Sequence, residues 1–407
     1  MGGVINLQSL QSTKKKSFLS KDLTFSLVSI VLALLVGGFA ILIAGCNPVK
    51  AYLRMFMEVF KNFQRISYMS NHVVLLILTG LSVAFAFRTG LFNIGAEGQY
   101  MIGMLVATLV GYLIKLPMIL HIPITIITAS VAAGVWGWIS GYLKAKFQVN
   151  EVISNIMLNW IAFYVSNFIV VRRGIQVPDT GFTHYIHKSA RISLTQFPQI
   201  FGSANLNLGI ILAVIAAIFI KYLIFQTTVG YKLRAVGHNP LAAESAGINV
   251  GKSIMQSMFI AGVLAGIAGA INVMGTTFRA TQLGGFIGYG MDGMAISLIG
   301  LNTPYGVMLS ALFFGFLKYG VTFLQSDFSI SDDIIQLIMG SVMYFVAIAY
   351  IIRYLYQNVE NFFKSSNVSS SDKSIDIISE TEGNSMSTDK QDQLVGDNSN
   401  NNGDVNI

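Results

Sequence analysis

The most regular feature of the sequence is a series of long apolar runs separated by short polar segments. A run of about 18 residues or more can cross roughly 30 Å of hydrocarbon as a helix whose backbone hydrogen bonds are all internal. The candidate spans cover residues 24–44, 72–89, 95–115, 120–143, 153–171, 207–226, 254–275, 290–302, 305–325 and 334–352. We therefore predict an all-α fold, a polytopic membrane helix bundle of about ten transmembrane helices. The run 290–302 is too short for a straight crossing, which favours a helix broken within the membrane.

Basic residues between the spans predict the orientation of the chain. Cytoplasmic segments of membrane proteins carry an excess of Lys and Arg. With ten spans both termini lie on one side, where the basic residues are Lys14, Lys15, Lys16, Lys21, Arg88, Lys144, Lys146, Lys232, Arg234, Lys252 and Arg353. We therefore predict a multi-pass protein of the cell membrane with both termini in the cytoplasm.

The segment 47–71 departs from this charge rule, because it carries four basic residues yet is placed outside. Its apolar residues Tyr52, Met55, Phe56, Val59 and Phe60 recur at helical spacing. This pattern predicts an amphipathic segment that lies on the outer membrane surface.

Composition supports a membrane protein and divides the chain into three parts. Hydrophobic residues make up 53% of the chain and charged residues 11%, against about 25% charged in soluble proteins. Almost half of the 19 acidic residues lie after residue 356, in a stretch too polar to bury a core. We expect a cytoplasmic segment at 1–23, a transmembrane domain at 24–356 and a disordered acidic cytoplasmic tail at 357–407.

The sequence offers little for catalysis or metal binding. The single cysteine, Cys46, excludes a thiolate zinc site or an iron–sulfur cluster built from this chain alone. The five histidines form no metal-ligand pattern with carboxylates and are expected on the surface. We expect no catalytic residue, cofactor, metal ion or nucleic-acid partner.

Residues 246–253, AGINVGKS, end like a phosphate-binding P-loop. A P-loop needs a glycine, then four intervening residues, then Gly-Lys-Ser, and a buried strand before the loop. Here Ala246 stands where that glycine belongs, Gly247 is one residue too close, and a membrane span follows. We therefore predict that the chain neither hydrolyses ATP nor acts as an enzyme.

The cytoplasmic segment 227–253 contains the signals of a short helix. Asn239 can cap it, Pro240 suits its first position, and Gly247 can end it after an Ala-rich stretch. Such a helix presents a smooth surface for docking. The alternative is an ordinary cytoplasmic turn.

Polar side chains also interrupt the apolar runs. The stretch RTGLFNIGAEGQY, 88–100, holds Asn93, Glu97 and Gln99 among glycines. These groups either line a protected cavity beside a broken helix or form a polar cytoplasmic turn.

Two further amides, Asn155 and Asn159, lie four residues apart and therefore share one helix face. They either contact a neutral solute that forms hydrogen bonds or join neighbouring helices. Farther along, Gly262, Gly266 and Gly269 are spaced for close helix packing on one face.

The segment 227–253 resembles the coupling loop of permease subunits in ATP-binding-cassette (ABC) importers of the sugar, branched-chain amino acid and nucleoside group. The pattern Gly-x-Asn-x-x-Ala-Ala, followed by Ala-Gly-Ile, is matched by Gly237, Asn239, Ala242, Ala243, Ala246, Gly247 and Ile248. The resemblance implies a type II ABC importer fold, with the short helix seated in a groove of a separate ATPase. The coupling residues it implies are Arg234, Gly237, Asn239, Pro240, Ala242, Ala243, Glu244 and Gly247.

The stretch Leu-Phe-Asn-Ile-Gly-Ala-Glu-Gly-Gln at 91–99 is similar to the nucleoside, guanosine-type branch of this family. The sugar branch tends to show Gly-x-Asp-Leu-Ser-x-Gly there. The resemblance implies import of nucleosides by alternating access. The implied partners are an ABC ATPase subunit, a second permease subunit that is a different but related chain, a substrate-binding lipoprotein and the membrane lipid.

Asp292 is the only acid in the Gly-rich segment 284–300. It can bond a ribose hydroxyl, cap the broken helix or pair with Arg279, and we favour capping. We expect the substrate pathway to include Asn93, Glu97, Gln99, Asn155, Asn159 and Asp292.

Two other functions compete with nucleoside import. One is a simple-sugar, ribose-type ABC permease. The other is an ion-coupled secondary transporter, for which Glu97 and Asp292 are the candidates for a relay within the membrane.

Overall fold

The computed structural model describes residues 31–32, 34–43, 45–193, 206–328, 340–341 and 344. The predicted terminal segments 1–23 and 357–407 lie outside these residues, as does nearly all of the predicted span 334–352. The described part is helical, and its strand pairing is limited to isolated bridges, such as that between Ser193 and Asn207.

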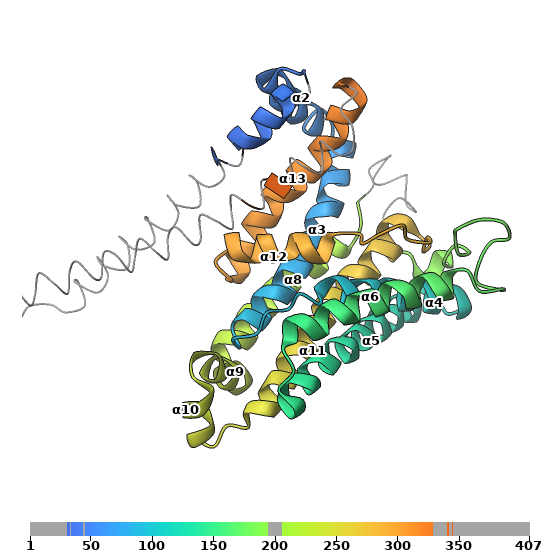
Figure 1. Ribbon diagram of the computed structural model, residues 1–407. Helices are drawn as coiled ribbons and strands as arrows, with labels where there is room; N and C mark the ends of the chain where they lie inside the picture. Colours follow the sequence, from blue (N-terminus) through green and yellow to red (C-terminus); the bar gives the residue numbers. More distant parts are fainter. Residues whose placement is uncertain are drawn as a thin grey trace, which may run out of the picture. The chain divides into compact units, whose positions relative to one another are not determined.

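Helices follow one another along the described chain, and a long loop that contains a 3₁₀ turn follows Val170 (Figure 1). They are α2 (Pro48–Val59), α3 (Phe63–Phe87), α4 (Ala96–Leu113), α5 (Met118–Phe147), α6 (Glu151–Val170), the 3₁₀ turn η1 (Lys188–Ala190), α8 (Gly209–Gln226), α9 (Thr228–His238), α10 (Pro240–Ser245), α11 (Val250–Asn272), the π-turn η3 (Val273–Thr277), α12 (Tyr289–Ile299) and α13 (Pro304–Phe328).

The prediction of about ten crossings is not confirmed. Within the described residues, six helices are long and apolar enough to span a membrane. They are Phe63–Phe87, Met118–Phe147, Glu151–Val170, Gly209–Gln226, Val250–Thr277 and Pro304–Asp327. The bent pair Leu34–Ile43 and Pro48–Val59 brings the number to seven if it forms one span. The predicted runs 95–115 and 290–302 do form helices, but α4 begins with a polar turn and α12 has only 11 residues.

Helix α11 packs closely between α4 and α5. A methyl group on Gly262 would overlap the carbonyl of Ala133 in α5, and one on Gly269 would overlap the carbonyl of Tyr100 in α4. Gly103 of α4 likewise faces the main chain of Gly266. The predicted close-packing role of the α11 glycines is therefore confirmed.

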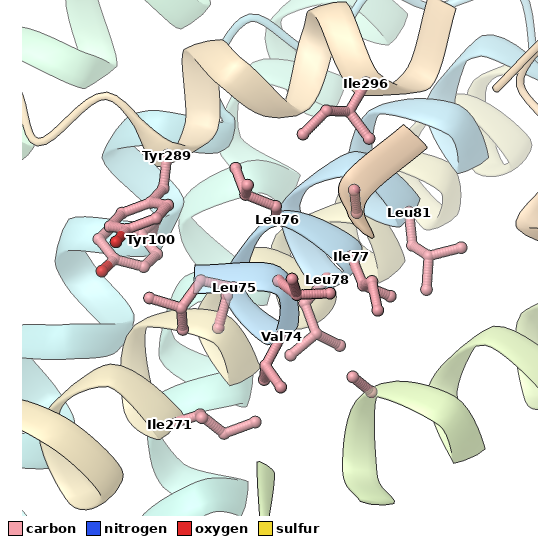
Figure 2. Close-up of a cluster of buried hydrophobic side chains, with 14 of the residues drawn as sticks. Val74, Leu75, Leu76, Ile77, Leu78, Leu81, Tyr100, Ile271, Tyr289 and Ile296 are labelled. Carbon is pink, nitrogen blue, oxygen red and sulfur yellow. The ribbon is translucent and has the colours of Figure 1, made fainter. Parts of the chain in front are cut away.

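Helix α3 lies in the middle of the apolar core, with Val74 to Leu78 and Leu81 all buried. Figure 2 shows these side chains between Ile271 of α11, Ile296 of α12 and the two rings of Tyr100 and Tyr289. The run Val-Val-Leu-Leu-Ile-Leu is apolar on every face because α3 is covered on every side.

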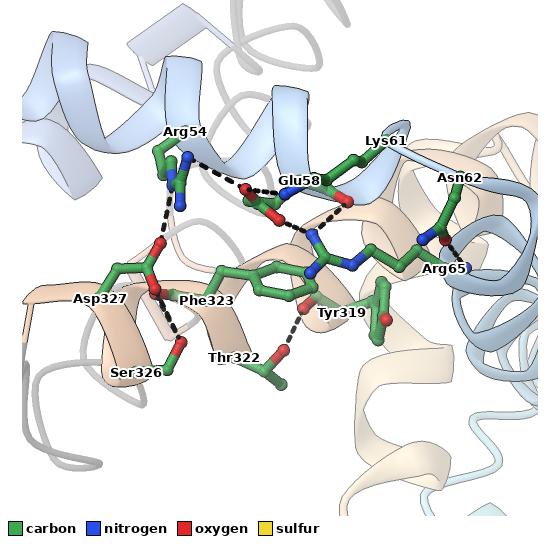
Figure 3. Close-up of polar contacts among 10 residues, drawn as sticks. All are labelled: Arg54, Glu58, Lys61, Asn62, Arg65, Tyr319, Thr322, Phe323, Ser326 and Asp327. Carbon is green, nitrogen blue, oxygen red and sulfur yellow. Dashed lines mark hydrogen bonds and ion pairs between the residues drawn. The ribbon is translucent and has the colours of Figure 1, made fainter.

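Helix α2 is amphipathic, as predicted for the first part of 47–71, whereas residues 63–71 begin the long helix α3. The apolar residues predicted to share one face differ in burial, however, because Met55 and Val59 are buried whereas Phe56 and Phe60 are exposed. Its buried carboxylate, Glu58, contacts three basic side chains, Arg54, Lys61 and Arg65 (Figure 3). Arg54 also pairs with Asp327 of α13 at 2.7 Å, so these charges join α2 to the starting end of α3 and to the final turn of α13.

Close packing at Gly269 can be tested with one alanine. We expect Gly269→Ala to destabilise the protein by about 1–3 kcal/mol, because the added methyl group meets the main chain of α4. The matched control is Gly251→Ala in the same helix, where the new methyl group would lie 3.6 Å from Ala145. Thermal unfolding in detergent should show a lower midpoint for Gly269→Ala only. Equal midpoints would contradict the packing role.

Candidate functional site

The polar stretch 88–100 folds into the turn between α3 and α4 and the first turn of α4. The side chains of Asn93 and Gln99 exchange two hydrogen bonds, of 2.9 and 3.0 Å. Asn93 also donates to the hydroxyl of Ser82, which in turn donates to the carbonyl of Ala261 in α11. Both amides are fully buried. This network joins α3, α4 and α11, so the two amides hold the turn in place.

The predicted amides of α6 reach the same turn. Asn159 accepts from the N–H of Gly98 at 2.8 Å and donates to the carbonyl of Ile94 at 3.1 Å. Asn155 donates to the carbonyl of Phe92 at 3.5 Å, and its oxygen is buried without a hydrogen-bond partner among the described residues. The hydrogen bonds of Asn159 join α6 to the start of α4, which matches the predicted role of joining neighbouring helices.

Glu97 caps the broken helix α12. Its two carboxylate oxygens accept the N–H groups of Gly288 and Gly290, each at 2.7 Å. A carboxylate is favoured at this end of a helix because it pairs with free N–H groups and with the positive end of the helix dipole. Gly288 has φ of +94°, a conformation that glycine adopts without strain.

The expectation that Asp292 caps α12 was wrong, since Glu97 occupies that position. Asp292 lies in the first turn of α12, where its carboxylate forms an ion pair with Lys318 of α13. Arg279 does not form the predicted pair with Asp292, and its guanidinium lies over Phe182 at 3.9 Å from the ring centre. Sequence reasoning missed Lys318, although a lysine inside an apolar span is itself the signal of a functional group.

Aromatic side chains surround this ion pair. The ammonium of Lys318 lies 4.4 Å from the ring centre of Tyr289, whose hydroxyl is 2.7 Å from Nδ1 of His72. The His72 ring lies 6.1 Å from the Tyr319 ring. The expectation of surface histidines was wrong for His121, which is buried with Nδ1 2.8 Å from the Ser189 hydroxyl.

The short helix predicted in the segment 227–253 is confirmed as α10, Pro240–Ser245. The Asn239 side chain accepts from the N–H of Ala242 at 3.1 Å, and Pro240 occupies the first position. At the other end Gly247 has φ of +78°, and the N–H of Ile248 returns to the carbonyl of Ala243 at 3.0 Å. These contacts are the capping geometry that the sequence signals specify.

The Gly-Lys-Ser sequence that resembles the end of a P-loop is explained by the start of the next helix, α11. Asn249 caps α11 by accepting from the N–H of Lys252 at 2.8 Å. Gly-Lys-Ser is therefore the first turn of the long apolar helix α11.

The residues of α10 that are exposed differ from the set of coupling residues that the sequence predicts, which includes Ala243. Leu241 is 76% exposed, whereas Ala243 is 4% exposed and packs within its own chain. Ala242 and Glu244 are exposed as well. The outward surface is therefore formed by every residue of α10 except Ala243, namely Pro240, Leu241, Ala242, Glu244 and Ser245.

The end of α9, within the segment 227–253, lies directly against the turn between α3 and α4. A side chain on Gly237 would overlap the main chain of Arg88 and Thr89, and Gly90 faces Gly237 from the other side. Arg88 donates through Nε to the carbonyl of Asn302, in the turn between α12 and α13, at 3.1 Å. The end of α9 thus contacts the turn that follows α3, and Arg88 extends the connection to α13.

Arg234, which precedes Gly237 by one helical turn, faces the same region. The guanidinium groups of Arg234 and Arg88 lie 5.5 and 5.7 Å from the ring centre of Phe225. The Nε of Arg234 is buried without a hydrogen-bond partner among the described residues.

Comparison with known proteins places these features in a family. Residues 65–347 match the family described as branched-chain amino acid transport system / permease component. The chain is 39% identical to the guanosine ABC transporter permease protein NupP of Bacillus subtilis, over 81% of this chain and 94% of NupP. It is 32% identical to the nucleoside ABC transporter permease protein NupB of Lactococcus lactis, over 80% and 91% of the two chains.

Two more distant relatives also match. The glucose ABC transporter permease protein TsgB13 of Haloferax volcanii is 30% identical over 78% of this chain and 85% of its own. A second guanosine permease of Bacillus subtilis, NupQ, is 27% identical over 67% and 86%. No solved structure matches the chain. The chain belongs to the branched-chain amino acid transport system permease component family and is a multi-pass membrane permease of the ABC transporter type.

Proposed function

We propose that this chain is the permease subunit of an ABC importer that moves nucleosides across the cell membrane, while a separate subunit hydrolyses ATP. The observation that carries the substrate class is the 39% identity to a guanosine permease over 94% of that relative. The glucose permease is 30% identical, so sugar import is the second candidate.

The contacts of the coupling segment support a path for the mechanical step. An ATPase docked on the exposed side chains of α10 would move α9, whose Gly237 lies against the turn after α3. Arg88 joins this turn to the α12–α13 turn through Asn302, and Glu97 joins α4 to the start of α12. Closure of the ATPase would therefore reach the helices around α12 and switch the access of the pathway from one side to the other.

We assign the predicted pathway residues to two roles. The four amides, Asn93, Gln99, Asn155 and Asn159, hold the turn at 92–99 between α3, α4 and α6. The two acids, Glu97 and Asp292, fix α12 at its start and against α13. An ion relay through the two acids is less favoured, because each carboxylate already has fixed partners.

The importer requires further subunits. The match to two guanosine permeases of one organism supports a second, related permease beside this chain. We include an ATPase and a substrate-binding lipoprotein, as in ABC importers. We place the α10 end of the bundle and both termini in the cytoplasm, because Lys232, Arg234 and Lys252 lie at that end.

Uptake by reconstituted vesicles tests the substrate class. Proteoliposomes that hold this chain, its ATPase, its second permease and its binding protein should accumulate labelled guanosine or adenosine when ATP is supplied. Ribose and glucose should not accumulate. Uptake of a sugar in place of nucleosides would transfer the chain to the second candidate function. Uptake by this chain alone, driven by an ion gradient, would exclude the ABC mechanism.

The docking role of α10 predicts a position-specific loss of coupling. We expect Leu241→Asp to lower ATP-driven uptake at least about tenfold and to release the ATPase during purification, because a charge replaces an exposed apolar contact. The control is Tyr231→Asp, which places the same charge at a 64% exposed residue of α9 outside the docking helix. If Leu241→Asp retains both the ATPase and normal uptake, α10 is not the docking helix. Ala243→Asp is a poorer probe, because it would first disturb packing within the loop.

The capping role of Glu97 predicts a different loss. Glu97→Gln removes the charge that pairs with two N–H groups of α12, which should cost about 0.5–2 kcal/mol of stability. Uptake should fall while membrane insertion persists. The same change at Glu151, whose carboxylate pairs with Lys144 at 2.7 Å at the start of α6, should leave uptake close to normal. Equal effects of the two substitutions would contradict the capping role.

A further inference from the structure

Lys318 and Asp292 form an ion pair in the interior of the bundle. Lys318 lies nine residues from the Asp327 end of its span, which corresponds to about 14 Å along the helix. His72 lies equally far from the Phe63 end of α3, on the same side of the bundle. Lys318 therefore lies deep within α13, where it meets Asp292 in the first turn of α12.

The pair is not sealed inside the chain. The Lys318 side chain retains 25% of its exposure and that of Asp292 retains 7%. A charged lysine that faces hydrocarbon at this depth is costly, and such residues face water-filled cavities or other protein. The surface around Lys318 therefore faces an aqueous pathway or the second permease rather than lipid.

Aromatic side chains continue this surface toward the outer end of α3. The ring of Tyr289 faces the ammonium of Lys318, and the Tyr289 hydroxyl forms a hydrogen bond with Nδ1 of His72. The His72 ring lies 6.1 Å from the Tyr319 ring and is tilted against it by 31°, and Tyr319 stacks at 6.2 Å with Tyr68. His72 and Tyr319 are half-buried and Tyr68 is 38% exposed, whereas Tyr289 is buried. The rings form a row that leads from near the end of the helices down to the ion pair.

This combination favours one class of solute. The ion pair has no net charge, so it does not select an ion, but its carboxylate and ammonium can exchange hydrogen bonds with hydroxyl groups. Partly exposed aromatic faces bind planar rings by stacking and contribute less to a sugar, which has no aromatic ring. A heterocyclic base linked to a ribose matches both halves of the surface.

We propose that the row of Tyr68, His72, Tyr289 and Tyr319, with the Lys318–Asp292 pair at its inner end, is a substrate-contact site of this permease. The base stacks on the partly exposed rings of Tyr68, His72 and Tyr319, Tyr289 supports His72 and Lys318 from within, and the ribose hydroxyls meet the ion pair. This inference rests on the proposed import of nucleosides.

The experiment uses the full importer in proteoliposomes and compares two readouts, nucleoside uptake and ATP hydrolysis stimulated by the loaded binding protein. Tyr319→Leu removes a ring from the row and should lower uptake about tenfold while stimulated ATP hydrolysis persists. Tyr319→Phe keeps the ring and should retain uptake. The matched control, Tyr305→Leu, removes a 51% exposed ring from the opposite end of the same helix and should leave both readouts unchanged.

A second measurement does not depend on the folding of a variant. Irradiation of the wild-type importer with an azido-nucleoside during turnover should label peptides of α3, α12 or α13 that contain the row, and excess guanosine should suppress the label. Labelling elsewhere in this chain, or none, would overturn the site. Unchanged uptake by Tyr319→Leu would also overturn the site. Equal loss of uptake and of stimulated ATP hydrolysis would overturn it too, because that result would show that the Tyr319 ring has only a structural role. Failure of the proposed function is a separate result, since wild-type vesicles would then take up no nucleoside.

Discussion

The start of α12 inside the bundle is the constraint on which much of this structure depends. The first N–H groups of a helix have no partner within the helix, and in an apolar interior no water replaces that partner. Glu97 satisfies two of these groups from α4. The position of Glu97 is in turn fixed by the turn before α4, which Asn93, Gln99 and Asn159 hold in place. Tyr289 and Asp292 follow directly, so their placement depends on the same carboxylate.

Features that depend on neighbouring residues could be predicted from the sequence. The ends of α10 follow from Asn239, Pro240 and Gly247, which act within one helical turn, and the structure confirms all three. The apolar runs located all the long helices of the described chain. The split of the apolar face of α2 into buried and exposed residues could not be predicted, because periodicity does not show which apolar residues the neighbouring helices cover.

Partners distant along the chain were beyond prediction. Glu97 and Gly288 are 191 residues apart, and nothing local shows that a carboxylate of α4 caps α12. The same holds for Asp292, whose assignment as a cap followed from its place in the first turn, while its real partner belongs to the next helix. Ala243 shows the same limit, since an Ala-rich pattern does not reveal which alanine faces outward.

The contact of Gly237 with the Arg88–Gly90 turn has a consequence for how force passes through the protein. Side chains between two moving segments absorb part of a displacement by changing rotamer. Here main chain meets main chain, and neither surface has a rotamer to change. Close-packed protein has low compressibility, so a small displacement of α9 is delivered to the turn almost undiminished. A backbone contact of this kind behaves as a stiff joint, and in the proposed importer the displacement of α9 would set the size of the response.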